Sequence, residues 1–318
     1  MIAIGIDIGG TSIKGAAITE KGKVLEVFSL PVIAGDSQET TINNLIATVK
    51  KYIVEQGFKQ EEILGIGLGV PGSIDSVRGY CDYSNNLKWS NLPIVKMFEK
   101  EFALPIKITN DANAAALGEA KFGAGRKFKN MILLTLGTGV GGGIIIDGKL
   151  YEGNAGKGAE LGHTVTKMNG RKCTCGRKGC LEAYASATGL IFDTKQAMKK
   201  DNKSLMWKIS KELGIIDARV AFEAAKQGDQ TAQKVVDNYI MYLGEGLLNF
   251  FNIFRPEAVV LSGGIANQGE YLFGRLDAYC QERKYGFECT PAVKILGSEL
   301  GYDSGKIGAA ALFFQGDF

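Results

Sequence analysis

The stretch that decides the fold is "IAIGIDIGGTSIKGAAITEKGKVLEVF", residues 2–28. Apolar runs alternate in it with a glycine-rich turn, "GGT", and a second turn, "EKGK", so the pattern predicts three successive β-strands. The stretch "MILLTLGTGVGGGIIIDGKLYEG", residues 131–153, has the same order of strand, glycine-rich turn, strand, turn and short strand. Both stretches are followed by helical patterns. This repetition indicates an ancient duplication, and it predicts two similar α/β lobes with a cleft between them.

The segments between and after these stretches continue the α/β pattern. A buried strand that runs into a Pro-Gly turn is predicted at residues 63–72, "ILGIGLGVPG", and a strand, a turn and an alanine-rich helix at residues 106–123, "IKITNDANAAALGEAKFG". Residues 258–272, "AVVLSGGIANQGEYL", predict a strand, a Gly-Gly turn and a helix. The chain closes with a small-residue helix, which we expect over 305–318. The lysine-rich residues 195–211 have the composition of a solvated helix surface.

Composition and charge exclude several classes of protein. At 318 residues the chain is long enough for two domains of ordinary size. The net charge is only +3, and lysine and arginine are scattered, so we expect neither nucleic acid nor a membrane as a partner. The start, "MIAIGIDIGG", lacks the positive region of a signal peptide, and the most apolar stretch, residues 131–146, is shorter than the ~20 apolar residues of a bilayer span. We therefore expect a cytoplasmic protein whose cysteines stay reduced.

Three glycine-rich turns follow predicted strands and are candidates for binding phosphate. Consecutive backbone N–H groups in a tight turn form a concave anion site, and glycine lets a phosphate approach without a Cβ in the way. One such turn alone is equally well an ordinary hairpin or strand–helix turn. Three together, two of them related by the repeat, favour a nucleotide held between the lobes. The turns are Gly9-Gly10-Thr11, Gly137-Thr138-Gly139 and Gly263-Gly264.

Two charged residues flank the first turn. Asp7 stands just before the glycine pair, where a carboxylate is placed to hold Mg²⁺ through water. Lys14 lies just beyond the turn, and it either faces the phosphates or is an ordinary surface lysine. The sequence therefore predicts that a magnesium-nucleotide binds at this turn.

A carboxylate stands where a predicted strand passes into the alanine-rich helix. Asn110 and Asp111 occupy this position, and as an isolated feature Asp111 is best explained as the N-cap of the helix. Phosphoryl transfer to an alcohol, however, needs one carboxylate that accepts the hydroxyl proton. An adjacent asparagine offers a donor and an acceptor to neighbouring hydroxyls, which suits a polyol substrate. We therefore consider Asp111 a candidate general base.

The single histidine of the chain precedes a cysteine cluster. The spacing is H-x9-C-x-C-x4-C, from His163 through Cys173 and Cys175 to Cys180. Three thiols and one imidazole make the four ligands of a closed tetrahedral zinc site, and a closed site has no position for a reactive water. The alternative is a reduced cluster without metal. We expect structural zinc, because so many free thiols would invite oxidation.

Two glutamates bracket this cluster. Glu160 and Glu182, taken alone, are equally well surface residues. A zinc-pinned loop, however, would fix both carboxylates relative to His163. Two rigid carboxylates and an imidazole edge form a suitable acceptor set for sugar hydroxyls.

The motifs together resemble one family. "IDIGGTSIKGAAI", "GVPGSID", "NDANAAALGE", "LGTGVGGGII", "ELGH", "CTCGRKGCLEAYAS" and "LSGG" occur in the order and spacing of the ROK family (repressors, open reading frames and kinases). The resemblance spans the whole chain. It implies a duplicated actin-like, ribonuclease H-like (ASKHA) α/β fold of two lobes around a cleft, with a small zinc-binding loop. It also implies ATP-dependent phosphorylation of a hexose, Zn²⁺ on the His/Cys₃ set, and homo-oligomers, dimers or tetramers.

The resemblance further implies roles for single residues. Asp111 matches the catalytic base, which takes the proton of the sugar's 6-hydroxyl as that oxygen attacks the γ-phosphoryl group. His163 would hold zinc through one nitrogen and face the sugar with the other. The sugar-holding positions match Asn110, Asp111, Glu160, His163 and Glu182, and, in a loop that varies within the family, Gly72 and Asn86. The nucleotide contacts match Gly10, Thr11, Gly137, Thr138, Gly139, Gly263 and Gly264.

The sugar is expected to be glucose. "LGTGVGGGII", "NLKW" and "CLEAYAS" look most like the glucokinases of the family. Ser73 in "PGSID" departs from them, since proline is more usual there, and its small polar side chain leaves room for another substituent. An N-acetylmannosamine kinase is the main alternative, followed by mannose, allose and fructose kinases, and polyphosphate is an alternative donor to ATP.

Two interpretations without catalysis remain. A sugar-responsive repressor of this family carries a DNA-binding winged helix ahead of the kinase-like part, whereas here Met1 leads directly into the first predicted strand. A catalytically silent sugar sensor is the other alternative. Asp111 and the three glycine turns are all present, which favours the enzyme.

The duplication and the motifs divide the chain into two lobes. We expect the N-terminal lobe over residues 1–113, completed by the C-terminal helix over 305–318. The C-terminal lobe is expected over residues 114–304 and contains the zinc loop, residues 160–182.

Overall fold

The computed structural model describes residues 1–286 and 290–314. The chain divides into two compact units. The first unit consists of Met1–Leu133, Gly143–Ala159 and Glu299–Phe318. The second unit consists of Leu134–Gly142 and Glu160–Ser298. The lobe boundaries expected from the sequence stay a prediction.

The first sheet is built from the opening hairpins and two later parallel strands. Its strand order is β3-β2-β1-β4-β8. β1 pairs antiparallel with β2 and parallel with β4, as expected for two hairpin strands followed by crossover strands. The alternation of residues places the isoleucines of β1 in the larger core on one face, while Ala3 packs in the smaller core on the other face. The strands are β1 (Ile2–Ile8), β2 (Ser12–Thr19), β3 (Val24–Pro31), β4 (Ile63–Val70) and β8 (Ile106–Asn110).

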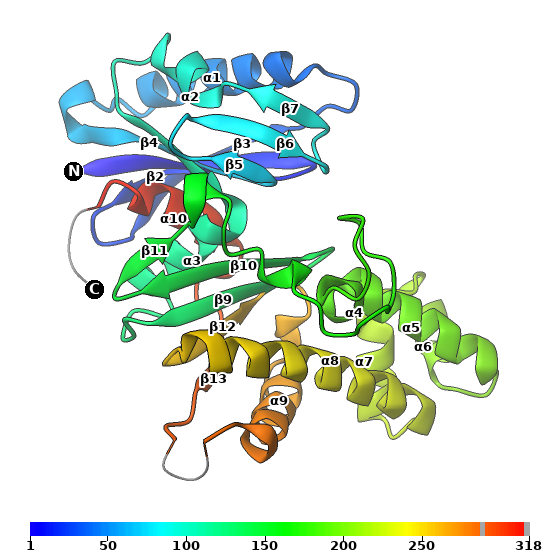
Figure 1. The fold of residues 1–318 in the computed structure, drawn as a ribbon. Helices are drawn as coiled ribbons and strands as arrows, with labels where there is room; N and C mark the ends of the chain where they lie inside the picture. The colour runs from blue at the N-terminus through cyan, green and yellow to red at the C-terminus, as the bar shows by residue number, and fades with distance from the viewer. Residues whose placement is uncertain (287–289, 315–318) are drawn as a thin grey trace. The chain divides into compact units, whose positions relative to one another are not determined.

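Helices cover both faces of this sheet (Figure 1). α1 (Gln38–Glu55) buries its apolar stripe on one face, within the larger core cluster. α3 (Asp111–Phe122) and α10 (Ser304–Ala311) pack on the other face. A Cβ at Gly308 would lie 1.6 Å from the Ala114 carbonyl oxygen, so only glycine allows α10 to approach α3 this closely. This approach brings the beginnings of both helices to the carboxyl end of β1.

The helix expected over 305–318 is shorter in the structure. α10 begins at Ser304 and ends at Ala311. Residues 315–318 lie outside the described residues. The remaining elements of the first unit include a small antiparallel sheet in the order β5-β6-β7. They are β5 (Ser73–Asp75), β6 (Tyr80–Ser84), β7 (Trp89–Leu92), α2 (Ile94–Glu99) and the 3₁₀ turns η1 (Gln60–Glu62), η2 (Asn154–Gly156) and η5 (Gly301–Asp303).

The second five-stranded sheet repeats the arrangement of the first. Its order is β11-β10-β9-β12-β13, with β10 and β11 antiparallel and β12 and β13 parallel. The predicted duplicated α/β fold is therefore confirmed. The strands are β9 (Met131–Leu136), β10 (Val140–Ile146), β11 (Lys149–Tyr151), β12 (Ala258–Ser262) and β13 (Lys294–Gly297).

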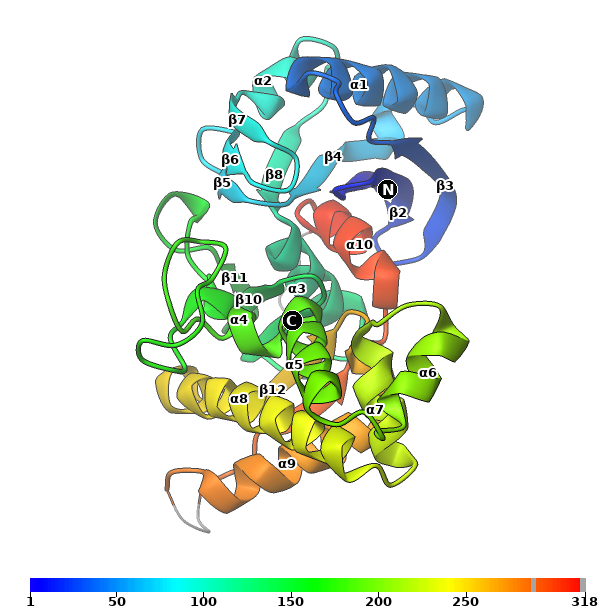
Figure 2. The ribbon, with the colours of Figure 1, turned by 90° about the vertical axis from the view of Figure 1, so that its right-hand side faces the viewer.

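The helices of the second unit gather around the long helix α8, which lies between α9 on one side and α5 and α7 on the other (Figure 2). The lysines of residues 195–211 are exposed, as expected for a solvated helix surface. Within the described residues, no helix is both long enough and apolar enough to span a bilayer. The helices are α4 (Glu182–Ala185), α5 (Ala187–Lys200), α6 (Met206–Leu213), α7 (Ala218–Lys226), α8 (Gln230–Phe254), α9 (Glu270–Arg283) and the turns η3 (Leu161–His163) and η4 (Ala266–Gln268).

Candidate functional site

The candidate base stands at the first turn of α3 in the first unit. The N-cap of this helix is Asn110, whose side-chain oxygen accepts from the N–H groups of Ala112 at 2.8 Å and Asn113 at 3.3 Å. The interpretation of Asp111 as the N-cap is therefore wrong, because the extended backbone at Asn110 gives that position the cap. Asp111 is half-buried, and its Oδ1 accepts from the Ala112 N–H at 2.9 Å. A short side chain on the first helical residue thus carries the carboxylate without serving as the cap.

Asp111 shares its surroundings with a second acid, Asp7 on β1. Burial, followed by the charge of Asp111, raises the pKa of Asp7 from 3.8 to about 6, while Lys306 and Lys14 lower it. Burial also raises the pKa of Asp111, against hydrogen bonds that lower it. A Cβ at Gly305 would lie 2.8 Å from the Asp7 carboxyl carbon, so glycine makes room for the acid at the start of α10. Two desolvated carboxylates near each other form a site that attracts protons or cations.

Sequence reasoning missed Lys306. It is 3% exposed and pairs with the carboxylate of Asp303. A lone lysine inside the small-residue segment "SGKIGAAA" is the signal that was available, because a buried cation needs an anionic neighbour. Its charge acts on Asp7 and so belongs to the electrostatics of this site.

The first glycine turn joins β1 to β2 near these acids. The Gly9 N–H donates to the Ser12 carbonyl at 3.0 Å, which closes the hairpin within itself. Gly10 and Thr11 are exposed, and a Cβ at Gly10 would meet nothing within 4 Å. Lys14 is also exposed and lies opposite Asp7 in the β1–β2 register. The turn therefore exposes Gly10 and Thr11 at the carboxyl end of β1, although the Thr11 carbonyl accepts from the Val32 N–H at 3.0 Å.

The loop after β4 is tied to the candidate base. The Asn110 side-chain nitrogen donates to the Gly72 carbonyl at 3.1 Å. Glu152, which sequence reasoning also missed, accepts from the buried Thr109 hydroxyl at 2.6 Å and from the Ser76 hydroxyl at 3.4 Å. These bonds fix both ends of the Gly72 loop to the end of β8. Asn86 lies apart from them, exposed in the connection between β6 and β7.

In the second unit the other two glycine turns lie side by side at the end of β9. The Gly137 N–H donates to the Gly139 carbonyl at 3.1 Å and closes the β9–β10 turn. Gly263 has φ +89°, and a Cβ there would lie 2.6 Å from the Leu136 carbonyl oxygen, so glycine is required both for the backbone and for the space. Thr138 is exposed at the tip of its turn. The structure thus brings together two of the three predicted phosphate turns.

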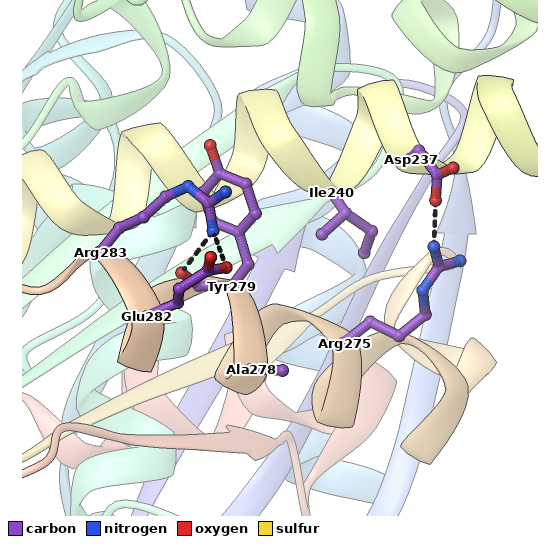
Figure 3. A pocket seen from close by; sticks show the side chains of 7 residues that line it. All are labelled: Asp237, Ile240, Arg275, Ala278, Tyr279, Glu282 and Arg283. Carbon is purple, nitrogen blue, oxygen red and sulfur yellow. Dashed lines mark hydrogen bonds and ion pairs between the residues drawn. The ribbon is translucent and has the colours of Figure 1, made fainter.

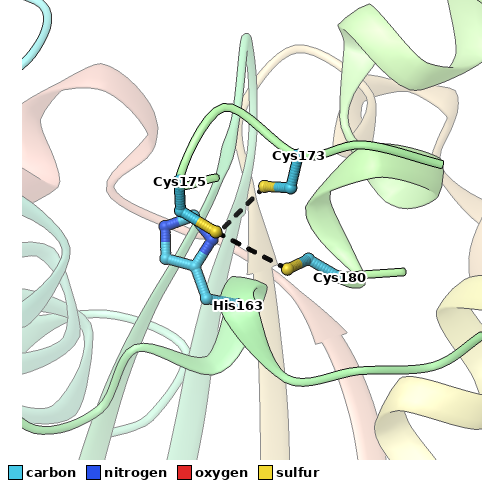
Figure 4. Close-up of side chains that lie close together, drawn as sticks. All are labelled: His163, Cys173, Cys175 and Cys180. Atoms are coloured by element: carbon cyan, nitrogen blue, oxygen red, sulfur yellow. Dashed lines mark hydrogen bonds between the residues drawn. The ribbon is translucent and has the colours of Figure 1, made fainter. Parts of the chain in front are cut away.

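The predicted metal ligands converge in the second unit (Figure 4). One ligand atom from each of His163, Cys173, Cys175 and Cys180 lies within 4.8 Å of all the others. The Cys173 sulfur is 3.6 Å from His163 Nδ1, and the Cys175 and Cys180 sulfurs are 3.7 Å apart. Three sulfurs and one imidazole nitrogen in such a cluster fit the donor set of tetrahedral zinc. The C-x-C spacing works because Gly176 and Gly179 both have positive φ.

The two glutamates near the cluster differ. Glu160 is exposed and precedes η3. Glu182 is half-buried: one carboxylate oxygen accepts from the Val140 N–H at 3.1 Å, and the other accepts from the Thr174 hydroxyl at 3.0 Å. The Cys173 thiol also donates to it, at 3.4 Å. Glu182 therefore connects the cysteine loop, residues 173–180, to the β9–β10 turn and is not merely a surface residue.

A separate groove of 390 Å³ lies between α8 and α9 (Figure 3). Asp237 pairs with Arg275 and Glu282 with Arg283, while Tyr279 donates to Glu245 at 2.6 Å. The charges of the groove thus satisfy one another, and the candidate site residues lie elsewhere. The residues that line it are Asp237, Ile240, Arg275, Ala278, Tyr279, Glu282 and Arg283.

Comparisons with known proteins agree over nearly the whole chain. The ROK family model matches residues 3–315. A glucokinase of Thermotoga maritima is 37% identical over 313 residues, which cover 97% of this chain and 96% of that protein. A glucokinase of Halalkalibacterium halodurans is 35% identical, over 98% of this chain and 94% of that protein. The solved ROK family glucokinase of Streptomyces griseus, in complex with glucose and AMPPNP, has a TM-score of 0.83 and 33% identity, over 99% of this chain and 100% of its own.

Proposed function

This chain belongs to the ROK family, and we propose that it is an ATP-dependent glucokinase, which transfers the γ-phosphoryl group of ATP to the 6-hydroxyl of glucose. The observation that carries the proposal is the half-buried carboxylate of Asp111, left free of the N-cap role by Asn110. Near-full-length similarity to glucokinases, one of them solved with glucose and an ATP analogue, supports the choice of substrates.

Asp111 acts as the general base in this proposal. Its carboxylate takes the proton of the 6-hydroxyl while that oxygen attacks the γ-phosphorus and the bond to the β–γ bridging oxygen breaks, so that ADP leaves. A base is most effective when its pKa approaches the working pH, and burial raises the pKa of Asp111 in that direction. Asp7 would hold Mg²⁺ through water, and the ion would neutralise the charge of the phosphates.

Polar groups are proposed to hold the sugar. Asn110 and Gly72 are already joined by a hydrogen bond in the first unit, so the loop of Gly72 can respond to the shape of the sugar. Glu160 and Glu182 would accept hydrogen bonds from sugar hydroxyls, and His163 would face the sugar with its free ring nitrogen. Asn86 completes the proposed set from its exposed turn.

The backbone of the glycine turns is proposed to contact the nucleotide. The proposed contacts of the first turn are Gly9, Gly10 and Thr11, with Lys14 as a cation for the phosphates. The proposed contacts of the other two turns are Gly137, Thr138, Gly139, Gly263 and Gly264.

Zinc is the metal that we propose for His163, Cys173, Cys175 and Cys180. Four protein ligands leave no open position, so zinc would fix the geometry of the loop and take no part in bond breaking. The proposal also includes two lobes, residues 1–113 and 114–304. It further includes a cytoplasmic location and assembly into dimers or tetramers.

The test is ADP release with ATP and Mg²⁺ over a panel of sugars: glucose, mannose, allose, fructose, N-acetylglucosamine and N-acetylmannosamine. We expect glucose to give the highest kcat/KM. A preference for N-acetylmannosamine would contradict the assignment and point to Ser73 in the Gly72 loop. Sugar binding without turnover on any member of the panel would instead indicate a sensor.

A further inference from the structure

One short segment of the second unit holds the β9–β10 turn from outside. This segment, residues 182–188, makes three hydrogen bonds to it. The Ala187 N–H donates to the Gly137 carbonyl at 2.8 Å, and the Thr188 hydroxyl donates to the Thr138 carbonyl at 2.8 Å. The Val140 N–H donates to Glu182 at 3.1 Å. The turn is thus bonded at both of its leading carbonyls and at the amide that follows it.

These bonds orient the amide groups of the turn. In a trans peptide the N–H of one residue points opposite to the carbonyl of the residue before it. Because the Gly137 and Thr138 carbonyls both face the start of α5, the N–H groups of Thr138 and Gly139 both point away from it. Two consecutive N–H groups on one side form an anion-binding concavity. The bonds therefore give the turn the orientation that phosphate binding needs.

The segment itself is anchored in the core of the second unit. The Ser186 hydroxyl caps α5 by accepting from the Gly189 N–H at 3.0 Å, and Ser186 is 2% exposed. The buried Tyr239 hydroxyl donates to the Ala185 carbonyl at 2.9 Å. Arg171 donates to the Ala183 carbonyl at 2.7 Å. A support fixed in this way resists rotation of the peptides that it holds.

The lack of a side chain at Gly139 also serves this contact between the turn and residues 182–188. A Cβ at Gly139 would lie 2.4 Å from the Glu182 carboxylate oxygen, so glycine admits the acid against the backbone. The other oxygen of Glu182 bonds to Thr174 in the cysteine loop. The segment therefore connects the cysteine loop to the turn through contacts within one unit.

We propose that Thr188 is a positioning residue for the nucleotide: its hydroxyl holds the Thr138–Gly139 peptide so that the Gly139 N–H meets a phosphate on the same side as the Thr138 N–H. The inference rests on the proposed ATP-dependent function. Thr188 acts through the turn, and its loss would free one peptide to rotate away from the phosphate.

The experiment compares the zinc-loaded wild-type protein with Thr188→Val, which removes the hydroxyl at nearly constant volume. Calorimetric titration measures the Kd of AMPPNP and of glucose separately, with zinc content determined for each sample. For Thr188→Val we expect the Kd of AMPPNP to rise about 10-fold, because the peptide that it frees would weaken one N–H bond to the charged phosphate. The Kd of glucose and the zinc content should not change. Thr188→Ser should restore nucleotide affinity.

Thr194→Val is the matched control. Thr194 lies on the same helix, but its hydroxyl donates within α5, to the Leu190 carbonyl at 2.8 Å. This variant should keep the nucleotide affinity of the wild type. Unchanged AMPPNP binding by Thr188→Val, an equal loss of glucose and nucleotide affinity, or failure of serine to rescue would overturn the positioning role alone. Absence of AMPPNP binding by the wild type would overturn the proposed function with it.

Discussion

The hairpins β1–β2 and β9–β10 hold the same place in their sheets, yet their glycine turns are built differently. Asp7 precedes the first turn at the position where Thr135 precedes the second. Asp7 is a desolvated acid with a pKa raised to about 6, whereas Thr135 accepts the Gly141 N–H at 3.1 Å and satisfies its own hairpin. Both turns close on themselves, but outside support differs: the Val32 N–H donates to the Thr11 carbonyl of the first turn, whereas the segment of Thr188 bonds two carbonyls of the second.

This difference shows that the two copies of the duplicated fold share their strand order but differ in the charged groups near their turns. The strand order is retained because hydrophobic alternation and turn glycines specify it in both copies. The charges are not retained. The first copy has the acids Asp7 and Asp111, whereas the acid beside the second turn, Glu182, bonds to the Val140 N–H and to Thr174 of the cysteine loop.

Asp111→Asn tests the chemical side of the comparison and should have the largest effect. The amide keeps a polar contact at the start of α3 but cannot accept the hydroxyl proton. We expect kcat to fall by about 10²–10⁴-fold, while calorimetry should find glucose affinity within a few-fold of the wild type. A variant with near-normal kcat would show that another group is the base.

Cys175→Ser tests the role of the cysteine loop in the second copy. Cys175 is exposed, so the substitution costs little packing, and its effect reports on the metal. We expect loss of zinc, a stability loss of several kcal/mol as for structural zinc sites, and weaker glucose binding. Elemental analysis and thermal unfolding measure the first two. Cys280→Ser, at a buried cysteine of α9 outside the cluster, controls for the loss of a thiol as such and should keep its zinc. Full zinc occupancy in Cys175→Ser would count against the four-ligand site.

Asp7→Asn sharpens the contrast between the two turns, because it should change how the free energy of unfolding depends on pH. The pKa of Asp7 is raised from 3.8 to about 6 on folding, mainly by burial. Below pH 3.8 the Asp7 carboxyl is protonated in both the folded and the unfolded state, so its full stabilising contribution to folding is present. That contribution is lost as pH rises through 6, and it amounts to at most about 3 kcal/mol. Relative to the wild type, the variant should therefore gain stability between pH 4 and pH 7. Denaturant titrations that give one constant difference over this range would refute the assignment.

Thr135→Val should have the smallest effect. It removes one acceptor for the Gly141 N–H, so we expect a loss of about 1 kcal/mol in unfolding free energy that does not vary with pH. The kcat should stay within about 3-fold of the wild type, since one local hydrogen bond is lost. A fall in kcat as large as that of Asp111→Asn would mean that the second turn also supplies chemistry.

The sequence predicted the parts of the molecule that depend on local pattern. Alternating apolar residues and turn glycines predicted both hairpins, and the H-x9-C-x-C-x4-C spacing predicted the side chains that converge at His163. The choice of Asn110 as N-cap depends on its backbone angles, φ −66° and ψ 149°, which the residue types alone do not decide.

Long-range contacts were beyond sequence reasoning for another reason. The effect of Lys306 on Asp7 joins residues at opposite ends of the chain, and the bond of Glu152 to Thr109 crosses from the second hairpin to β8. Neither has a periodic signal, because each depends on how closely glycines let the elements approach. The roles assigned to the predicted site residues stay predictions until the variants are measured.

The most direct test of the central claim is phosphorus NMR of the product formed from glucose and ATP, with 6-deoxyglucose as the control sugar. We predict glucose 6-phosphate and ADP in equal amounts, and no sugar phosphate from 6-deoxyglucose. Phosphate on another hydroxyl, or ADP formed without any sugar phosphate, would contradict the assignment of the 6-hydroxyl as the acceptor.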